Sequence, residues 1–460
     1  MKILVQKFGG TSLDSQEHRE MAVRKVIQAQ QAGHASVVVV SAIGRSGAPY
    51  ATDSLIGFLE AVDPQAPMPP RELDVMMGCG EIISAAVFAR ALQASGIKAS
   101  ALTGGQAGII TDEVYGNARI REIRTQHLLS LLRKGITPVV CGFQGATDHS
   151  EEDESWSLTT LGRGGSDTTA TALGAALKAT AVEIYTDVDG VKSADPDLVP
   201  DARTLDVCSY EEVAEIAHQG ARVVHPRAVE IAMDHRMPLW VKGTFTESPG
   251  TRIESIPNRG AGAPRVTGVT HTGKIVFIRL EIGETVHKAS VEREVYRMMS
   301  RAGVNIHYVT FGPNALSFGV PRDKFPIARD LLDGMVVPVP YEAPDSSGKV
   351  AAFFIFKFSE GLDLAYSVQR PLLRAMESKI DVVDVPGAVF ENCTTVSVVT
   401  SGHRRVPGIM AGVFETLAGA GVAVYQTADS EMSVSFLVPE SDAERAVRLL
   451  HARFCQTTAA

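Results

Sequence analysis

Short apolar strands alternate with helical stretches through the first half of this chain, and this alternation limits the possible folds more than any other feature. Val37 to Val40 is a continuous apolar run, as expected of a strand covered on both faces. Similar runs lie at residues 2–5, 99–102, 138–140 and 181–185, between helical stretches at about 15–32, 72–95, 119–134, 168–178 and 210–218. This alternation predicts an α/β domain with a mainly parallel sheet.

Composition excludes several classes of protein. The 460 residues, 45% of them apolar, can form roughly three domains of about 150 residues each. A net charge of -9 with scattered Lys and Arg argues against a nucleic-acid partner. Five cysteines without CxxC spacing argue against a disulfide framework or a structural zinc site. Since there is no signal segment and no apolar run long enough to cross a membrane, we expect a cytoplasmic protein without a membrane partner.

Breakers and turn formers mark a domain boundary near residue 246. They gather in Glu247 to Gly250 and again in Pro257 to Pro264. The expected organisation is a first domain at 1–246, a linker at 247–265, a module at 266–340, an intervening segment at 341–391, a second module at 392–455 and a tail at 456–460.

The two modules are copies of one unit, related by a constant offset of 118 positions. Matching pairs are Val295 and Val413, Gly303-Val304 and Gly421-Val422, Ser317-Phe318 and Ser435-Phe436, Val320-Pro321 and Val438-Pro439, and Leu331-Leu332 and Leu449-Leu450. Each copy has the pattern of a helix, a strand entered through Gly-Val, a second strand and a second helix, which predicts two small α+β modules. The segment between them, with a strand at 353–356, a helix at about 365–376 and a strand at 382–385, is either a partial third module or an elaborated connection.

Two glycine turns are candidates for phosphate binding. Lys7-Phe8-Gly9-Gly10-Thr11-Ser12 follows the first strand, and Gly162-Arg163-Gly164-Gly165-Ser166-Asp167 leads into an alanine-rich helix. Both combine free backbone N–H groups with a helix N-terminus, where an anion is stabilised, and Lys7 adds a positive charge suited to phosphoryl transfer. Neither turn is a Walker A motif, and no GxGxxG, HExxH or GxSxG sequence occurs, so phosphate handling by helix ends is the remaining interpretation.

Three polar segments have both a functional and a structural interpretation. The acidic turn from Tyr185 to Pro196 is either a solvated loop or a nucleotide-binding loop at the C-terminal end of a strand. The acidic run from Asp148 to Glu154 is typical of a solvated hairpin tip, because adjacent like charges repel. His225 before Pro226 is more typical of packing at a helix start than of a general base.

Together these motifs resemble those of the aspartokinases, most closely the monofunctional Bacillus type. In order they are Lys7 to Ser12, Val40-Ser41-Ala42, Gly80-Glu81, Gly162 to Asp167, Thr186 to Gly190 and Val224 to Glu230. The repeat resembles the paired ACT domains of that family. The resemblance implies an amino-acid kinase sandwich followed by two ACT modules of ferredoxin-like α+β fold, which transfers the γ-phosphoryl of ATP, with Mg²⁺, to the β-carboxylate of L-aspartate.

The resemblance also implies roles for single residues. Lys7 would neutralise the transferred phosphoryl group, Gly9, Gly10 and Ser41 would hold phosphate oxygens, and Thr186 and Asp187 would line the nucleotide site. Arg163 would bind the α-carboxylate of the substrate, Glu81 its ammonium, and Thr52 and Ser166 would add hydrogen bonds, while Asp167 would orient the reacting groups. No general base is needed, because a carboxylate with an ordinary pKa of about 3.9 is ionised at neutral pH. No resident metal site is expected.

The chain departs from the family pattern after Thr186-Asp187. There the family commonly has an aromatic residue and then Asp-Pro-Arg, whereas this chain has Lys192 and Asp195-Pro196-Asp197. Our hypothesis is that Lys192 supplies the missing charge in the nucleotide site, so that Lys192→Ala raises the apparent KM for ATP several-fold.

In this family the ACT modules bind an amino-acid end product where two modules meet. The resemblance places Asn305, Gln426 and Asp429 near such an effector, whose identity as lysine, threonine or diaminopimelate stays open. Because two modules form a shared sheet only by association, a homodimer is expected; the alternative is that the modules only dimerise the chain. A catalytically impaired amino-acid sensor, or another amino-acid kinase, is the alternative function, and acetylglutamate or glutamate kinases are disfavoured because they lack the paired modules.

Overall fold

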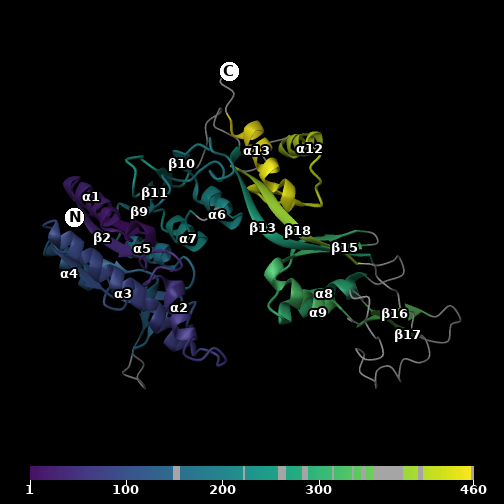
Figure 1. Ribbon diagram of the computed structural model, residues 1–460, viewed down its shortest axis with the longest axis horizontal. Helices are drawn as coiled ribbons and strands as arrows, with labels where there is room; N and C mark the ends of the chain where they lie inside the picture. The colour runs from purple at the N-terminus through teal and green to yellow at the C-terminus, as the bar shows by residue number, and fades with distance from the viewer. Residues whose placement is uncertain are drawn as a thin grey trace. The chain divides into compact units, whose positions relative to one another are not determined.

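The computed structural model describes residues 1–148, 156–220, 223–256, 266–281, 288–312, 315–333, 336–342, 349–355, 387–401 and 408–456 (Figure 1). The described chain forms two compact units. Unit 1 is Met1–Thr270 together with Val399–Ser401 and Phe454–Ala460, and unit 2 is His271–Val398 with Gly402–Arg453.

An eight-stranded sheet forms the centre of unit 1, in the order β10-β12-β11-β9-β1-β2-β6-β3. Its strands are β1 (Lys2–Phe8), β2 (His34–Val40), β3 (Ala99–Leu102), β6 (Thr137–Cys141), β9 (Ala181–Thr186), β10 (Val207–Cys208), β11 (Leu239–Gly243) and β12 (Thr251–Ile253). Every neighbouring pair is parallel except β11 and β12. The expected mainly parallel sheet is therefore confirmed.

Side chains of the continuous apolar run in β2 pack into two hydrophobic cores. Val37 and Val39 join one core with helices α4 (Gln126–Arg133), α5 (Gly165–Ala176), α6 (Tyr210–His218) and α7 (Pro226–Asp234). Val38 and Val40 join another with α1 (Gln16–Gln31) and α3 (Pro70–Ala94). Because successive strand residues face opposite sides of a sheet, both sides of β2 must be apolar. Helices on both faces of the sheet make a three-layer domain.

Helix α3 has 25 residues and is, within the described residues, the only helix long and apolar enough by composition to cross a membrane. Half of its most apolar stretch is buried inside the protein, where Ala85, Phe88 and Leu92 pack into the core beside β6. These contacts explain its apolar character as that of a core helix.

A second sheet, in the order β5-β4-β7-β8, was not expected from the sequence. It consists of β4 (Ile109–Thr111), β5 (Ile120–Ile123), β7 (Gln144–Thr147) and β8 (Leu158–Thr160). The helix predicted at 119–134 is wrong in its first part, because Ile120–Ile123 pairs with β4 and only Gln126–Arg133 is helical. The apolar residues at 120, 123 and 128 have helical spacing, which hides the turn between the two elements.

Strand β12 lies inside the segment 247–265 that the sequence suggests as a linker. Gly250 has φ +80, which allows a tight turn after β11, and β12 then pairs antiparallel with β11. The sheet of unit 1 therefore continues past residue 246, and residues 257–265 lie outside the described chain.

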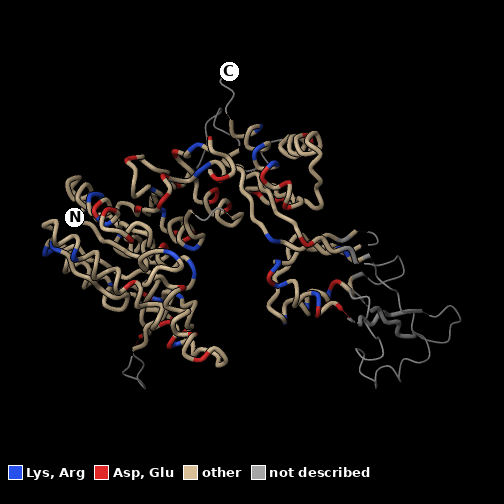
Figure 2. Tube along the Cα trace, viewed as in Figure 1, with Lys and Arg blue, Asp and Glu red and all other residues tan. Residues whose placement is uncertain are grey.

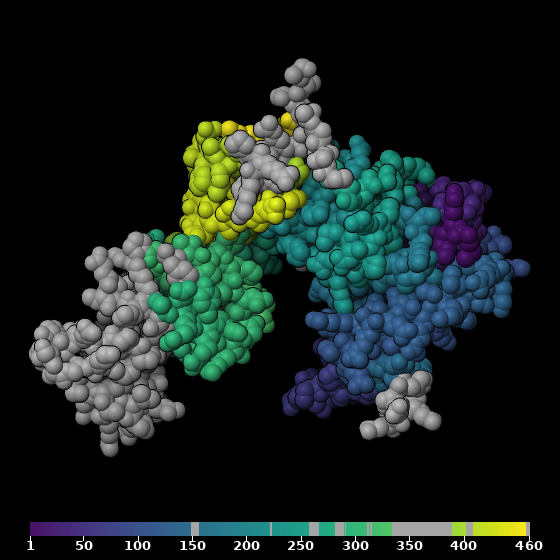
Figure 3. Space-filling model, turned by 180° about the vertical axis from the view of Figure 1, so that it is seen from behind, coloured from purple at the N-terminus to yellow at the C-terminus, as the bar shows by residue number. Residues whose placement is uncertain are grey.

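Unit 2 repeats one order of elements, as the 118-residue offset predicts. The first copy has β13 (Val266–Glu281), α8 (Lys288–Arg301), β14 (His307–Phe311), β15 (Ala315–Pro321) and α9 (Phe325–Leu332). The second has β18 (Gly387–Thr400), α12 (Ile409–Gly419), β19 (Gln426–Asp429), β20 (Ser433–Pro439) and α13 (Ala443–Phe454). Gly303 and Gly421 occupy the same left-handed conformation, with φ of 66° and 70°. Figure 3 shows the second copy, in yellow-green and yellow, as a compact body.

The two copies form one six-stranded sheet, in the order β14-β15-β13-β18-β20-β19. The expectation that such a sheet requires association of two chains is wrong, because β13 and β18 of the same chain are neighbours at its centre. Between the copies, β16 (Val336–Glu342) and β17 (Lys349–Ile355) form a separate antiparallel pair. The helix expected at 365–376 and the strand at 382–385 lie outside the described residues.

Candidate active site

Three of the sequence motifs meet at the C-terminal ends of adjacent parallel strands. Strand β1 lies between β2 and β9, and Phe8 is in register with both Val40 and Tyr185. The backbone N–H of Gly9 donates to Tyr185 O at 3.2 Å, and that of Ser41 donates to Phe8 O at 3.2 Å. The first glycine turn, Ser41 and the Thr186-Asp187 turn are therefore assembled at the edge where α/β sheets bind ligands.

Gly10 permits the close approach of two of these segments. A Cβ atom at this position would lie 2.3 Å from Ala42 O and 2.7 Å from Gly44 O. The backbone N–H of Gly44 donates back to Gly10 O at 3.1 Å. Any larger residue at position 10 would push the loop after β2 away from the glycine turn.

Lys7 and Asp167 form an ion pair between the two glycine turns. Their Nζ and Oδ1 atoms lie 2.8 Å apart, and both side chains are 13% exposed. Asp167 lies in the first turn of α5, where a negative charge is stabilised by the helix dipole. The pair places a positive and a negative group where phosphate would meet the helix end.

His225 packs against the second glycine turn and binds Asp167. The second glycine turn is left-handed at Gly164, with φ 72, and a Cβ there would lie 2.2 Å from the His225 ring. The His225 backbone N–H donates to Asp167 Oδ2, and its Nδ1 accepts from the N–H of Arg227 at the start of α7. Burial lowers the pKa of His225. The interpretation of His225 as a packing and helix-start residue is confirmed.

Glu81 is a buried carboxylate with one oxygen unused. It is 2% exposed, and its Oε1 accepts from the backbone N–H of Ala42 at 3.0 Å. Its Oε2 is buried and has no hydrogen-bond partner within the described chain. Burial raises the pKa of Glu81 to about 8. A buried carboxyl oxygen without a partner makes Glu81 a candidate for contact with a ligand.

The other residues expected to contact a small substrate make few interactions within the described chain. Ser166 lies one residue before Asp167, and its Oγ would be 2.8 Å from a Cβ at Gly142. Thr52 is the first residue of α2 (Thr52–Glu60), and Arg163 is exposed in the second glycine turn. Among the residues that the structure describes, neither Thr52 nor Arg163 makes a side-chain hydrogen bond, so their groups are free to meet a ligand.

The loop after β9 carries a set of paired charges. Thr186 Oγ1 donates to Asp187 Oδ1 at 3.0 Å, and Asp187 also forms an ion pair with Arg45. Lys192 Nζ lies 2.7 Å from Asp189 Oδ1 and donates to Thr204 Oγ1 at 2.8 Å. The bond to Lys192 lowers the pKa of Asp189. Lys192 therefore fixes the shape of this loop.

Asp197, where the family resemblance led us to expect an arginine, is exposed. Its backbone N–H donates to Asp195 Oδ1 at 3.0 Å. The contact closes a turn around Pro196 and brings no positive charge to the loop.

Two residues at or near the site were missed from the sequence. Arg45 belongs to none of the sequence motifs, and only its ion pair with Asp187 shows that it lies near the proposed nucleotide site. Asp74 lies on α3, is fully buried, and accepts hydrogen bonds from Gly116 N, Thr160 N and Thr160 Oγ1. A carboxylate between Leu73 and Val75 in an apolar helix was the available signal for Asp74.

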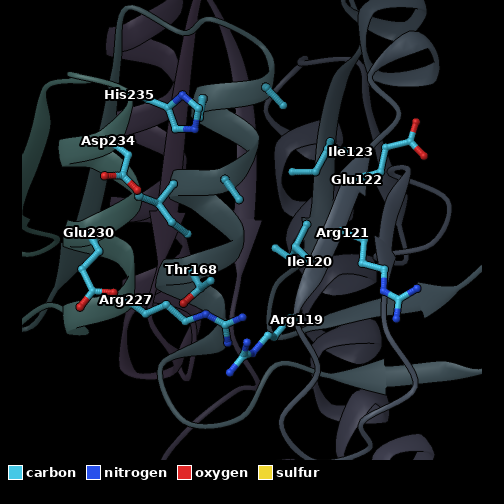
Figure 4. A pocket seen from close by; sticks show the side chains of 14 residues that line it. Arg119, Ile120, Arg121, Glu122, Ile123, Thr168, Arg227, Glu230, Asp234 and His235 are labelled. Carbon is cyan, nitrogen blue, oxygen red and sulfur yellow. The ribbon is translucent and has the colours of Figure 1, made fainter.

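A groove of about 520 Å³ lies beside the site, between β5, α5 and α7. Figure 4 shows Ile120 and Ile123 pointing into it and the guanidinium groups of Arg119 and Arg227 close together at one end. Arg227 donates to Ala118 O and Leu161 O, at 3.3–3.5 Å. None of the site residues expected from the sequence lines this groove, although Thr168 follows Asp167 directly.

The three expected effector residues lie in unit 2. Asn305 is exposed between α8 and β14, and Asp429 is exposed at the end of β19. Gln426 Nε2 donates to Thr310 Oγ1, which joins the outer strands β19 and β14. No contact between Asn305 and the other two occurs in the described structure.

Lys and Arg are interspersed with Asp and Glu over the described chain (Figure 2). Many ion pairs join residues close in sequence, such as Arg448 with Glu444, and others join distant segments, such as Arg124 with Asp148 at 2.7 Å. The rest of the acidic run after Asp148 lies outside the described residues.

Comparison with known proteins adds family relationships to this geometry. The amino acid kinase family matches residues 2–243, and the ACT domain family matches residues 389–452. Aspartokinase 1 of Bacillus subtilis is 36% identical over 458 residues, covering 99% of each chain. The aspartokinase of Mycolicibacterium smegmatis is 35% identical over 461 residues, covering 99% of this chain and 96% of that protein.

A solved structure shares the fold. E. coli aspartokinase III, crystallised with aspartate and ADP, matches with a TM-score of 0.68 and 21% identity over 99% of this chain and 100% of that one. At this identity the match shows the fold alone.

Proposed function

The chain belongs to the aspartokinases of the amino acid kinase family, and on this premise we propose that it transfers the γ-phosphoryl group of ATP to the β-carboxylate of L-aspartate. An oxygen of the β-carboxylate attacks the γ-phosphorus, the bond from that phosphorus to the bridging oxygen of ADP breaks, and 4-phospho-L-aspartate and ADP leave. The product is the first intermediate toward lysine, threonine and methionine. The observation that carries the proposal is the buried Glu81 oxygen without a partner, beside two glycine turns.

Substrate recognition follows from the charges at this edge of the sheet. Glu81 receives the ammonium group of aspartate, and the exposed guanidinium of Arg163 binds its α-carboxylate in a bidentate manner. Thr52 and Ser166 donate hydrogen bonds to the substrate. The β-carboxylate is already ionised near neutral pH, so positioning and neutralisation of charge are sufficient for attack.

The phosphate groups of ATP occupy the glycine turns. Gly9, Gly10 and Ser41 bind phosphate oxygens, and Lys7 neutralises the group in transfer. Lys7 is held by Asp167, which orients it between donor and acceptor. Thr186, Asp187 and Lys192 border the nucleotide, and Lys192 acts by ordering the loop through Asp189.

Mg²⁺ fits this site as a companion of the nucleotide. Within the described residues there is no group of three or more His, Cys, Asp or Glu side chains that would hold a metal ion alone. Magnesium in kinases is commonly bound by one or two carboxylates together with substrate phosphates, and Asp167 at the second glycine turn and Asp187 after β9 are the carboxylates that would hold it. When bound, the ion neutralises negative charge on the phosphates.

The second half of the chain gives this activity feedback control. An end-product amino acid binds at the ACT modules near Asn305, Gln426 and Asp429 and lowers the rate. The six-stranded sheet forms within one chain, so the proposed homodimer rests on the family resemblance alone. We assign the enzyme to the cytoplasm, where its substrates occur.

The test incubates the purified chain with ATP, Mg²⁺, L-aspartate and hydroxylamine, which traps an acyl phosphate as a hydroxamate. Aspartyl hydroxamate should form with L-aspartate and not with L-glutamate or N-acetyl-L-glutamate. Addition of lysine, threonine and diaminopimelate in turn identifies the effector. Absence of aspartyl hydroxamate, with binding of aspartate intact, would favour an amino-acid sensor instead.

A further inference from the structure

The positive side chains of the nucleotide site are mostly engaged with the protein. Lys7 pairs with Asp167, and Lys192 binds Asp189 and Thr204. Asp197 occupies the position where an arginine was expected. A nucleotide with several negative charges therefore meets fewer free cations on this side than the family pattern supplies.

Arg45 differs from these residues in its exposure. Its side chain is 73% exposed, and in the described structure its ion pair is with Asp187, a residue of the proposed nucleotide site. Exposed ion pairs contribute little to stability, because water already solvates both groups. The guanidinium can consequently turn from Asp187 toward a second anion at small cost.

The backbone beneath Arg45 is, in contrast, held firmly. Ser41 N–H donates to Phe8 O, Ala42 N–H to Glu81, and Gly44 N–H to Gly10 O. Gly44 has φ +86, and a Cβ there would lie 2.5 Å from the Ala48 side chain. The loop thus holds the backbone of Arg45 next to the first glycine turn, while its guanidinium group is exposed and paired with Asp187.

We propose that Arg45 binds the phosphate groups of the nucleotide and supplies the charge that Asp197 does not provide. A guanidinium group has five N–H donors in a planar fork, so it can bridge Asp187 and a phosphate oxygen at once. The backbone N–H of Ala42 in the same loop donates to Glu81, so this loop contacts both the proposed phosphate site and the proposed ammonium site. This inference rests on the proposed kinase function, because it places phosphates at the glycine turns.

The test measures binding of ADP by calorimetry, with Mg²⁺ and with EDTA, to the full-length chain. Arg45→Ala should weaken ADP binding about tenfold in both conditions, as expected for loss of one charge-assisted contact, and Arg45→Lys should fall between. Binding of adenosine, which has no phosphate, should stay unchanged. Arg71→Ala is the matched control, because Arg71 is 55% exposed and pairs only with its neighbour Glu72 among the described carboxylates.

Kinetics separate this role from a structural one. Arg45→Ala should raise the KM for ATP about tenfold and leave the KM for aspartate within about twofold. Unchanged ADP binding would overturn the inference. A loss of ADP affinity that disappears in EDTA would also overturn it, because the effect would then act through the metal and Asp187. An equal loss of adenosine affinity would overturn it as well, because it would indicate a damaged site.

The outcome is distinguishable from failure of the proposed function. If ADP binding depends on Arg45 but no aspartyl hydroxamate forms, the inference stands and the substrate assignment fails. If the hydroxamate forms and ADP binding is indifferent to Arg45, the inference fails alone.

Discussion

Helix α3 carries two buried carboxylates in different surroundings, Asp74 in its first part and Glu81 two turns later. Asp74 accepts hydrogen bonds on both oxygens, from the backbone N–H of Gly116 and from the backbone and hydroxyl of Thr160. Glu81 accepts one, from Ala42, and its other oxygen has no partner within the described residues. Burial raises the pKa of both groups.

The contrast separates a carboxylate whose hydrogen bonds are complete within the described chain from one that we propose to bind substrate. The contacts of Asp74 attach α3 to the second sheet, because Thr160 ends β8 and Gly116 lies between β4 and β5. Glu81 carries an unsatisfied oxygen, which a protein retains at a cost unless a ligand completes it. Burial alone does not identify a site; the position of Glu81 beside Ala42 and the glycine turn, together with its unpartnered oxygen, makes it a candidate.

Replacing Glu81 by glutamine should have the largest effect on activity. The amide keeps the shape and can still accept from Ala42, but it cannot neutralise an ammonium group. We expect kcat/KM for aspartate to fall about 100-fold or more, with KM for ATP nearly unchanged. Steady-state kinetics with either substrate varied would measure this. Activity near that of the unchanged chain would remove Glu81 from the substrate site.

Asp74→Asn should act on stability instead. The N–H of Gly116 contacts both oxygens of Asp74, so in either orientation the amide nitrogen of asparagine would face a buried N–H donor. We expect the free energy of unfolding to fall by about 2 kcal/mol, measured by urea denaturation, with kcat/KM for aspartate within about threefold. A large loss of activity in a fully folded Asp74→Asn variant would erase the distinction between the two carboxylates.

The pKa of Glu81 near 8 predicts a pH dependence of activity. Only the ionised form receives the ammonium group, so kcat/KM for aspartate should fall about tenfold per pH unit below pH 8 and level off above it. A profile that is flat between pH 6 and 9 would contradict the raised pKa.

The same shift predicts a pH dependence of stability. The unfolded chain ionises Glu81 above its ordinary value of 4.5, and the folded chain only near 8. Its contribution to stability is therefore fully present below pH 4.5 and lost as the pH rises through 8. The melting temperature of Glu81→Gln, measured by differential scanning calorimetry, should rise relative to that of the unchanged chain across this range. If the variant and the unchanged chain have equal melting temperatures at all pH values, burial does not raise the pKa of Glu81.

Lys192→Ala should have the smallest effect among these variants. The sequence led us to expect a several-fold rise in the apparent KM for ATP because Lys192 would supply charge to the nucleotide. The structure gives another reason for the same rise, since removal of Lys192 frees Asp189 and loosens the loop. Kinetics at varied ATP would show this. An unchanged KM would mean that this loop does not border the nucleotide.

Local patterns predicted much of this molecule. The apolar run of β2 predicted a central strand because helices cover both of its faces. The two glycine turns were recognised from the sequence, and the structure shows that the close contacts at Gly10 and Gly164 leave no room for a Cβ atom. The 118-residue offset predicted the repeated elements of unit 2.

What could not be predicted depends on tertiary contacts. Strand β5, whose Ile120 and Ile123 have helical spacing, is a strand only because β4 pairs with it. The ion pair of Arg45 with Asp187 joins residues 142 positions apart, and no local pattern signals it. The hydrogen-bond partners of Asp74 likewise come from distant strands and loops.

The most direct test of the central claim compares L-aspartate with succinate, which has the same two carboxylates but no ammonium group. If Glu81 receives that ammonium, the unchanged chain should phosphorylate succinate about 1000-fold less efficiently than aspartate, and Glu81→Gln should remove most of this difference. Equal use of both compounds, or a ratio that Glu81→Gln leaves unchanged, would contradict the account.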